Sequence, residues 1–215
     1  MLGKVLAGVV MLLGVALAAS RSRAAPGCGR YGARVDDPAT TAPLEFHVAG
    51  DDDVAAVVAL VESAYRGEPS LAGWTTEAHL LGGQRTDPAA VRALVRSPDH
   101  VLLCARRGGA LEGCCDVSRR GDGAHLAMLA VHPHRQRGGV GAALLAEAER
   151  TAASAWGSRT VRLLVISARV ELLAWYRRRG YELTGETEPF PYGDERFGVP
   201  RRDDLEFVEL RRTIG

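Results

Sequence analysis

The sequence predicts a mixed α/β fold, in which a central sheet of about seven strands is flanked by helices. Strand-like segments alternate with segments of helical apolar periodicity along most of the chain. The apolar run from His125 to Val131 leads through a glycine-rich turn into a helix-like segment, and a second helix-like segment ends at Gly180. With 215 residues, 47% hydrophobic and 25% charged, the chain suits one domain of ordinary size with an appendage.

In the first half of this domain, Leu44–Val48 alternates between apolar and polar residues and is predicted to be a strand. Residues 51–65 carry acids in the first turn and apolar residues at helical spacing, which predicts a helix. A polar, glycine-punctuated loop over 66–87 leads to a short helix over 89–95. The next predicted element is a hairpin of residues 100–105 and 111–117 around Arg107-Gly108-Gly109.

The second half repeats the alternation of strands and helices. Strands are predicted over 124–132, 160–165, 181–187 and 205–211, helices over 139–153 and 170–179, and a long loop over 188–203. A loop of this length is more often functional or disordered than idle.

The N-terminal residues differ from the rest of the chain. Residues 1–25 contain an apolar run from Val5 to Ala19, preceded by Lys4 and followed by arginines, which fits a signal peptide, a short anchor or an over-extended start. The arginines favour a cytoplasmic location for the domain on their C-terminal side, with residues 5–19 as a possible membrane tether. Residues 26–43 are predicted to be a linker, and 44–213 the globular domain.

Charge and cysteine content narrow the function. The net charge of +1 gives no strong field for a nucleic acid, and no nucleic-acid partner is expected. The four cysteines have no paired metal-ligand spacing, and His132 and His134 have no third ligand at a suitable spacing, so no metal is expected. Buried thiols in a reducing compartment are the expected state of Cys104, Cys114 and Cys115.

The segment Gln136-Arg137-Gly138-Gly139-Val140-Gly141 lies between a predicted strand and a predicted helix. Glycines allow a close backbone approach, and the N–H groups at a helix N-terminus bind phosphate. The spacing is Gln/Arg-x-x-Gly-x-Gly, which differs from dinucleotide-binding and nucleoside-triphosphate loops. The alternative is a tight connection without a ligand.

A second motif lies downstream, Trp175-Tyr176-Arg177-Arg178-Arg179-Gly180-Tyr181, which reads as a helix end, a glycine cap and a strand entry. In this order the two motifs resemble the GCN5-related N-acetyltransferase (GNAT) family, over roughly residues 44–212. The resemblance implies a sheet that splays between its fourth and fifth strands. It also implies acetyl transfer from acetyl-CoA to a primary amine by direct attack in a ternary complex.

The resemblance implies a cofactor site in two pieces. The backbone of Leu129, Ala130 and Val131 would pair with the pantetheine arm, and Gln136 occupies the family's Gln/Arg position at the loop start. Backbone amides would hold the pyrophosphate, and these belong to Arg137, Gly138, Gly139, Val140, Gly141 and Ala142. Tyr176 occupies the position of a tyrosine that would protonate the departing thiolate, and packing under the sheet is the alternative.

The chain departs from the family pattern at two positions. Arg169 replaces an asparagine that contacts pantetheine in many members, and Ala127 replaces a glutamate that acts as the base in some. His125, Glu112 and Glu77 are the remaining candidates for a base that acts through water. Because the inherited base is missing, a non-catalytic CoA-binding sensor or partner module is the alternative function, and a membrane-tethered interaction protein a third.

Two loops, over 65–87 and 188–204, are predicted to cover the acceptor side. Glu77, Asp194 and Glu195 are the candidates for holding a cationic amine by charge pairing. The acceptor is expected to be a small-molecule amine or a peptide, and the protein a monomer or a homodimer. The sequence leaves open a small metabolite, an antibiotic, a peptide N-terminus or a protein lysine as acceptor.

Overall fold

The structure, a computed structural model, describes residues 42–215. The elements in chain order are β1 (Leu44–Val48), η1 (Asp51–Asp53), α2 (Val54–Tyr65), α3 (Gly67–Ser70), β2 (Leu81–Gly82), α4 (Pro88–Arg96), β3 (His100–Arg107), β4 (Ala110–Arg120), β5 (Gly123–Val131), η2 (Pro133–Arg135), α5 (Val140–Trp156), β6 (Thr160–Ile166), α6 (Val170–Arg177), β7 (Glu182–Pro189), η3 (Glu195–Phe197), β8 (Val199–Pro200) and β9 (Glu206–Thr213). The predicted first segment and most of the predicted linker lie outside the described residues. Among the described residues, no helix has the length and apolar character needed to cross a membrane.

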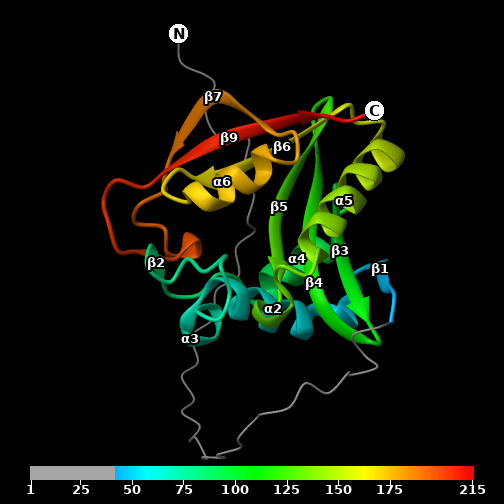
Figure 1. Ribbon diagram of the computed structural model, residues 1–215, viewed down its shortest axis with the longest axis horizontal. Coiled ribbons are helices and arrows are strands. Elements are labelled where there is room, and N and C mark those ends of the chain that lie inside the picture. Colours follow the sequence, from blue (N-terminus) through cyan, green and yellow to red (C-terminus); the bar gives the residue numbers. More distant parts are fainter. Residues whose placement is uncertain (1–41) are drawn as a thin grey trace, which may run out of the picture.

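Seven strands form one mixed sheet in the order β1-β3-β4-β5-β6-β9-β7, which confirms the predicted fold class (Figure 1). Only the β5–β6 pair is parallel, as expected for two strands joined through a helix. Helices α2 and α4 pack on one face of the sheet around Cys104, Cys114 and Ala130. Helix α5 packs on the other face around Val117 and Leu126, with residues of α6 in the same cluster.

Local sequence explains most element boundaries. The buried residues of α2 follow helical spacing, so one face of the helix is apolar: Val54, Val57, Leu60, Val61, Ala64 and Tyr65. Helix α4 begins after Asp87, whose carboxylate accepts the N–H of Ala90 at 2.8 Å, with Pro88 in the first turn. Helix α5 ends at Gly157, whose φ of 62° is the left-handed conformation that glycine adopts most readily.

Strands β5 and β6 are paired only at their starts, through Ala124 with Val161 and His125 with Arg162 (Figure 1). On the other side of β5, the register with β4 shifts between Cys114 and Asp116, so Met128 and Leu129 together oppose Cys115. Met128 has a φ of 51°, which is uncommon for a residue other than glycine. A bulge of this kind bends its strand, so β5 turns away from β6 beyond the paired residues. The splay expected between the fourth and fifth strands of the large sheet is therefore present.

The two predicted acceptor loops contain structure that the sequence pattern did not reveal. Strand β2 in the first loop pairs with β8 in the second, through Leu81 with Pro200 and Gly82 with Val199. A third apolar cluster joins both loops to the ends of β6 and β9: Leu80, Leu81, Ile166, Phe190 and Leu205. The loops therefore form one cover over the splayed end of the sheet.

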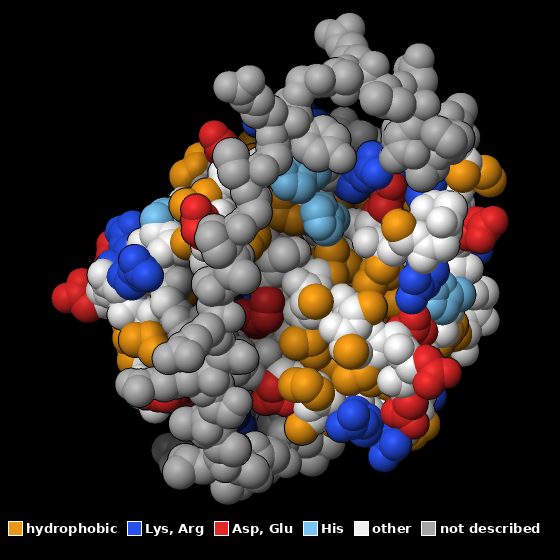
Figure 2. All heavy atoms as spheres, turned by 90° about the horizontal axis from the view of Figure 1, so that it is seen from below, with side chains coloured by type: hydrophobic (Ala, Val, Ile, Leu, Met, Phe, Trp, Pro, Cys, Tyr) orange, Lys and Arg blue, Asp and Glu red, His pale blue; other side chains and the backbone are white. Residues whose placement is uncertain are grey.

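The face of the molecule seen from below has acidic and basic side chains interspersed among apolar ones (Figure 2). This distribution agrees with the net charge of +1. No single-sign field of the kind that attracts a polyanion covers the visible part of this face.

Candidate functional site

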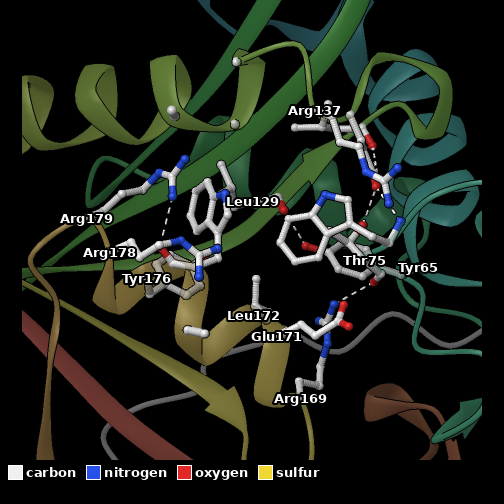
Figure 3. Close-up of a pocket in the computed structure, with 18 residues that line it drawn as sticks. Tyr65, Thr75, Leu129, Arg137, Arg169, Glu171, Leu172, Tyr176, Arg178 and Arg179 are labelled. Carbon is white, nitrogen blue, oxygen red and sulfur yellow. Dashed lines mark hydrogen bonds between the residues drawn. The ribbon is translucent and has the colours of Figure 1, made fainter.

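A hollow of about 530 Å³ lies between the end of β5, the glycine loop, α6 and the first acceptor loop (Figure 3). It is lined by Tyr65 from α2, Leu129 and Val131 from β5, and Tyr176 from α6. We call it the cofactor hollow. Of the predicted cofactor residues, it brings together Leu129, Val131, Gln136, Arg137, Gly139, Gly141 and Ala142.

The glycine loop presents a run of unbonded amides. Among the described residues, the N–H groups from Arg137 to Ala142 have no hydrogen-bond acceptor, and the first bonded amide of α5 is that of Ala143, which donates to Gly139 at 3.0 Å. Arg137 and Gly139 both have left-handed backbone, with φ of 68° and 85°. Because α5 has 17 residues, its N-terminus adds a partial positive charge beside these amides. The loop is therefore suited to bind phosphate oxygens.

Packing alone does not require a glycine at Gly141. A Cβ there would lie 3.5 Å from both the Trp175 ring and a Val131 methyl group, which is ordinary van der Waals contact. Trp175 in turn meets Trp74 of the first loop, with ring centroids 6.3 Å apart. The side of the hollow beside Gly141 is therefore formed by the side chains of α6 and the first loop.

The exposed edge of β5 is formed by alternate residues. Leu129 and Val131 line the cofactor hollow, whereas Ala130, which is 1% exposed, does not, and Ala130 and Val131 both pair with β4, opposite Cys114 and Gly113. The hydroxyl of Tyr65 donates to the Leu129 carbonyl at 2.5 Å, and Nε2 of Gln136 donates to the Val131 carbonyl at 3.0 Å. A ligand that pairs with this edge would accept hydrogen bonds from the N–H groups of β5, or its own donors would displace Tyr65 or Gln136 from these carbonyls.

Gln136 connects the glycine loop to the first acceptor loop. Its Oε1 accepts the N–H of Trp74 at 2.8 Å, and its Nε2 also donates to the Thr75 hydroxyl at 2.8 Å. The structure therefore places its side chain in the wall of the hollow as a brace. These partners are 61 and 62 residues away in sequence, and no local signal identifies them.

Four arginines line the cofactor hollow: Arg137, Arg169, Arg178 and Arg179. Arg169 pairs with Glu77, whereas the other three form no ion pair with an acid among the described residues. Arg179 lies over the Trp175 ring, 3.6 Å from its centroid, and donates to the Trp175 carbonyl at 3.0 Å. Burial and the neighbouring Arg178 lower the pKa of Arg179. The basic run at the end of α6 thus supplies positive charge to this hollow, which suits an anionic ligand.

Tyr176 is buried, at 5% exposure, and lines the hollow. Its hydroxyl has no hydrogen-bond partner among the described residues, and its ring packs edge-on against Trp175 and Tyr181. Burial raises its pKa above 10, with Tyr65 and Cys115 adding to the effect. The phenol is therefore protonated at neutral pH and free to donate a hydrogen bond to a bound group.

A second hollow of about 110 Å³ lies in the splay between β5 and β6, under the two acceptor loops. We call it the acceptor hollow. Both hollows share five residues: Tyr65, Leu129, Arg169, Leu172 and Tyr176. Tyr176 therefore lies where a group bound in one hollow would meet a group bound in the other.

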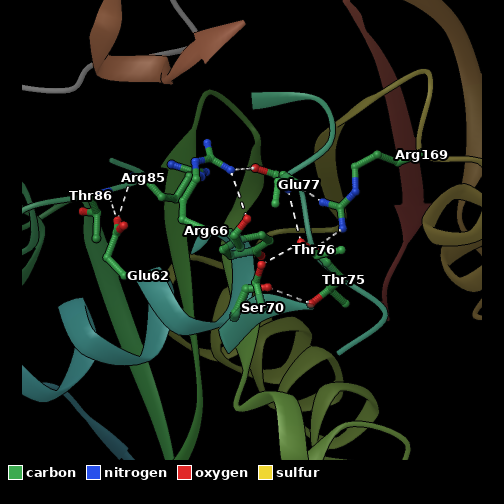
Figure 4. A network of polar contacts seen from close by, with 12 residues as sticks. Glu62, Arg66, Ser70, Thr75, Thr76, Glu77, Arg85, Thr86 and Arg169 are labelled. Atoms are coloured by element: carbon green, nitrogen blue, oxygen red, sulfur yellow. Dashed lines mark hydrogen bonds and ion pairs between the residues drawn. The ribbon is translucent and has the colours of Figure 1, made fainter. Parts of the chain in front are cut away.

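Glu77 lies between two arginines at this junction (Figure 4). Its carboxylate accepts from Arg66 Nη1 at 2.6 Å and from Arg169 Nη1 at 2.8 Å. Burial would raise the pKa of Glu77, but Arg169, Arg85 and Arg66 outweigh it and lower the pKa. Because both carboxylate oxygens are already bonded to guanidinium groups, the expectation that Glu77 holds an ammonium ion finds no support in this geometry.

Asp194 and Glu195 line neither hollow. Asp194 begins η3 and pairs with Arg196 two residues later. The structure therefore brings only Glu77 of the three predicted acids into the acceptor hollow, and a role for the other two stays a prediction.

The other candidate bases also lie outside both hollows. Glu112 is buried between Arg107 and Arg135, at 3.2 and 3.3 Å. His125 lies at the paired start of β5, where burial lowers its pKa to about 4. Ala127, which replaces the family's glutamate, lines the acceptor hollow. Glu171, exposed in the first turn of α6, lines the cofactor hollow and was not identified by sequence reasoning.

The described cysteines are buried thiols that line neither hollow. Burial raises the pKa of Cys104 to about 12 and those of Cys114 and Cys115 further.

One group of possible metal ligands occurs among the described residues. The ligand atoms of His47, Asp53 and Cys104 come within 4.8 Å of one another, away from both hollows. Asp53 there pairs with the Arg106 guanidinium at 2.6 Å, a charge that opposes a cation.

Comparison with known proteins concerns the family and the fold. A model of the acetyltransferase (GNAT) domain matches residues 98–183, from the start of the β3–β4 hairpin through the glycine loop and Tyr176 to the start of β7. A search of curated protein sequences finds no match.

Several solved structures share the fold at identities below 25%. The ribosomal-protein-S18-alanine N-acetyltransferase from Escherichia coli is 16% identical, with a TM-score of 0.60 over 80% of this chain and 95% of that one. The PaiA N-acetyltransferase from Thermoplasma acidophilum, solved with coenzyme A, is 17% identical, with a TM-score of 0.56 over 80% and 99%. The yncA protein from Salmonella typhimurium, solved with its cofactor acetyl-CoA, is 18% identical, with a TM-score of 0.59 over 80% and 94%. The family match thus identifies an acetyltransferase (GNAT) domain over residues 98–183 of this chain, and the described residues share the fold of these acetyltransferase structures.

Proposed function

We propose that this protein transfers an acetyl group from acetyl-CoA to a primary amine by direct attack in a ternary complex. The observation that carries the proposal is that the same hollow is lined by the glycine loop, whose amides from 137 to 142 are unbonded, and by Tyr176, whose phenol is unbonded. The amides suit the pyrophosphate of the cofactor, and the phenol lies where the acceptor hollow begins. Similar structures that hold coenzyme A or acetyl-CoA support this choice of cofactor.

The protein's main contribution is to bring the two reactants together. The glycine loop and the arginines hold the phosphates, and the edge of β5 aligns the acyl end with the splay. The amine nitrogen attacks the thioester carbonyl carbon, forming a C–N bond. The C–S bond then breaks, and the thiolate leaves with a hydrogen bond or a proton from Tyr176. The amine passes its proton to water, because Glu77 is paired with two arginines.

Direct attack is preferred to a covalent acetyl-enzyme. A nucleophilic cysteine needs a lowered pKa and access to the substrate. The described cysteines have raised pKa values and line neither hollow.

The test is calorimetry of the purified full chain with CoA, followed by thiol release from acetyl-CoA across a panel of amines. Binding with amine-dependent thiol release supports the transferase. Binding without release for any amine would favour the second candidate, a non-catalytic CoA-binding sensor or partner module of the same fold. The observation that favours this second candidate is that Ala127 lines the acceptor hollow where the family's glutamate base would lie. No binding of CoA would overturn both.

A further inference from the structure

The acceptor hollow is lined by a buried guanidinium, that of Arg66, whose hydrogen-bond donors are only partly satisfied. Arg66 is 5% exposed, and its Nη1 donates to Glu77 at 2.6 Å and to the Tyr65 carbonyl at 3.4 Å. Its Nε and Nη2 are buried and have no hydrogen-bond partner among the described residues. Unsatisfied donors on a buried charge are costly, and such groups in native proteins usually have a partner.

The charge around this hollow is unbalanced. Arg66, Arg85 and Arg169 line it, and Glu77 is the one acid among its described lining residues. Glu62, nearby in Figure 4, does not line the hollow, and its carboxylate accepts the backbone N–H groups of Arg85 and Thr86 at 2.6 and 2.8 Å. Three guanidinium charges against one carboxylate leave an excess of positive charge that an anion would offset.

The unbonded atoms of Arg66 form one edge of the guanidinium plane. Nε–H and Nη2–H point the same way, and this edge matches the two oxygens of a carboxylate or similar oxyanion. The rest of the hollow is largely apolar and includes three phenylalanine rings, those of Phe190, Phe197 and Phe207. Phe190 stacks on Phe207 with centroids 5.6 Å apart. The volume of about 110 Å³ suits a small molecule.

We propose that the acceptor is a small amine that also carries a carboxylate or similar oxyanion, which Arg66 binds through Nε and Nη2. This inference rests on the proposed function. An apolar part of the acceptor packs against the phenylalanines, and its amine reaches toward Tyr176, which lines both hollows. The charge requirement is thus the reverse of the acidic pocket expected from the sequence.

Binding tests the proposal without relying on turnover. Calorimetry of the full chain with saturating CoA would use 3-phenylpropanoate and 4-methylpentanoate, each against its uncharged amide. We expect each carboxylate to bind at least about tenfold tighter than its amide, because charged hydrogen bonds to a buried guanidinium are lost in the amide. Equal affinities, or no binding of either acid, would overturn the proposal.

Arg66→Lys tests whether the paired donors Nε and Nη2 are needed in addition to the positive charge. A lysine keeps one positive charge beside Glu77 but cannot present two donors along one edge. We expect the preference for acid over amide to fall about tenfold or more, with CoA affinity unchanged. Arg162→Lys is the matched control, because Arg162 lies on β6 and lines neither hollow. An unchanged preference in folded Arg66→Lys would contradict the assignment, and if this variant does not fold, the wild-type pairs decide.

Turnover distinguishes this inference from the proposed function. Leucine is compared with 3-methylbutylamine, phenylalanine with 2-phenylethylamine, and each amino acid with its aminophosphonate analogue. Faster acetylation of the oxyanion-bearing amines supports the inference, and the aminophosphonates show which oxyanion fits. If the neutral amines are acetylated equally well, the inference fails while the transferase stands. If CoA does not bind, the proposed function itself has failed.

Discussion

Arg169 and Glu77 lie 92 residues apart and meet in a 2.8 Å hydrogen bond that ties the start of α6 to the first acceptor loop. Arg169 also donates from Nη2 to the Thr75 carbonyl at 2.7 Å. Arg169, which replaces the family's asparagine, therefore uses its side chain to bind the first acceptor loop. Both side chains are at least nine-tenths buried, so the pair has little access to water.

Removing one partner of this pair is expected to be costly. Glu77→Gln leaves Arg66 and Arg169 without their carboxylate, and we expect a loss of about 3–5 kcal/mol in the free energy of unfolding. Urea denaturation of both single variants and the double variant Glu77→Gln/Arg169→Met would give the coupling energy. The control is the more exposed pair of Arg162 and Glu209, 3.2 Å apart, where the same cycle should give less than about 1 kcal/mol. A coupling no larger than in this control would show that the buried pair does not brace the loop.

Gly139→Glu is expected to lose CoA affinity by about tenfold or more, because the new carboxylate would compete with phosphate at the N-terminus of α5. Gly139→Ala is the matched control, since any side chain at a φ of 85° carries the same backbone strain of about 1–2 kcal/mol. Open space surrounds a Cβ at Gly139, so neither variant meets a steric obstacle there. Calorimetry with CoA should show near-normal binding for Gly139→Ala. Equal affinities for the two variants would remove the loop from the phosphate site.

Tyr176→Phe is expected to lower kcat by about 10²-fold with little change in the KM for acetyl-CoA, because only help to the departing thiolate is lost. Since burial raises the pKa of Tyr176, no loss of rate from phenol ionisation is expected up to about pH 10. Tyr181→Phe is the control. The Tyr181 hydroxyl donates to Glu149 at 3.0 Å, and Tyr181 lines neither hollow. That variant should lose about 1 kcal/mol of stability and keep its rate. A wild-type rate in Tyr176→Phe would reduce the tyrosine to a packing role.

His125 is expected to make stability depend on pH. Burial, together with Arg120 and His100, lowers its pKa to about 4 from 6.5. Between these values the unfolded chain binds more protons than the folded one, so the free energy of unfolding falls as pH falls from about 6.5 to 4. Urea denaturation should show a contribution on the order of 2 kcal/mol between pH 7 and pH 5 that disappears in His125→Gln. An unaltered profile in His125→Gln would refute the assignment.

Features that depend on short segments were predictable. The order of strands and helices, the glycine loop and the position of Tyr176 before the Gly180 cap all follow from local periodicity, chain stiffness and backbone freedom. The hairpin of β3 and β4 and the helix α4, with Asp87 and Pro88 at its start, lie within a few residues of their predicted bounds.

The pairing of side chains was not predictable, because it joins residues far apart in sequence. Gln136 lines the cofactor hollow, and its amide also bonds to Val131, Trp74 and Thr75, partners that its motif position does not identify. Glu77 was expected to attract a cationic amine, yet Arg66 and Arg169 bind both of its oxygens. The pairing of β2 with β8 depends on two short segments that carry no strand signal of their own.

By itself, the sequence determined the fold class and the glycine loop between β5 and α5, since each depends on local backbone preferences and on apolar periodicity. Only the tertiary structure decided the charge of the acceptor hollow. Arg66, Arg85 and Arg169 meet there because α2, the first loop and α6 converge on the splay opened by the bulge at Met128 and Leu129. Electrostatic character depends on distances across the fold, and the spacing of residues along a chain does not specify those distances.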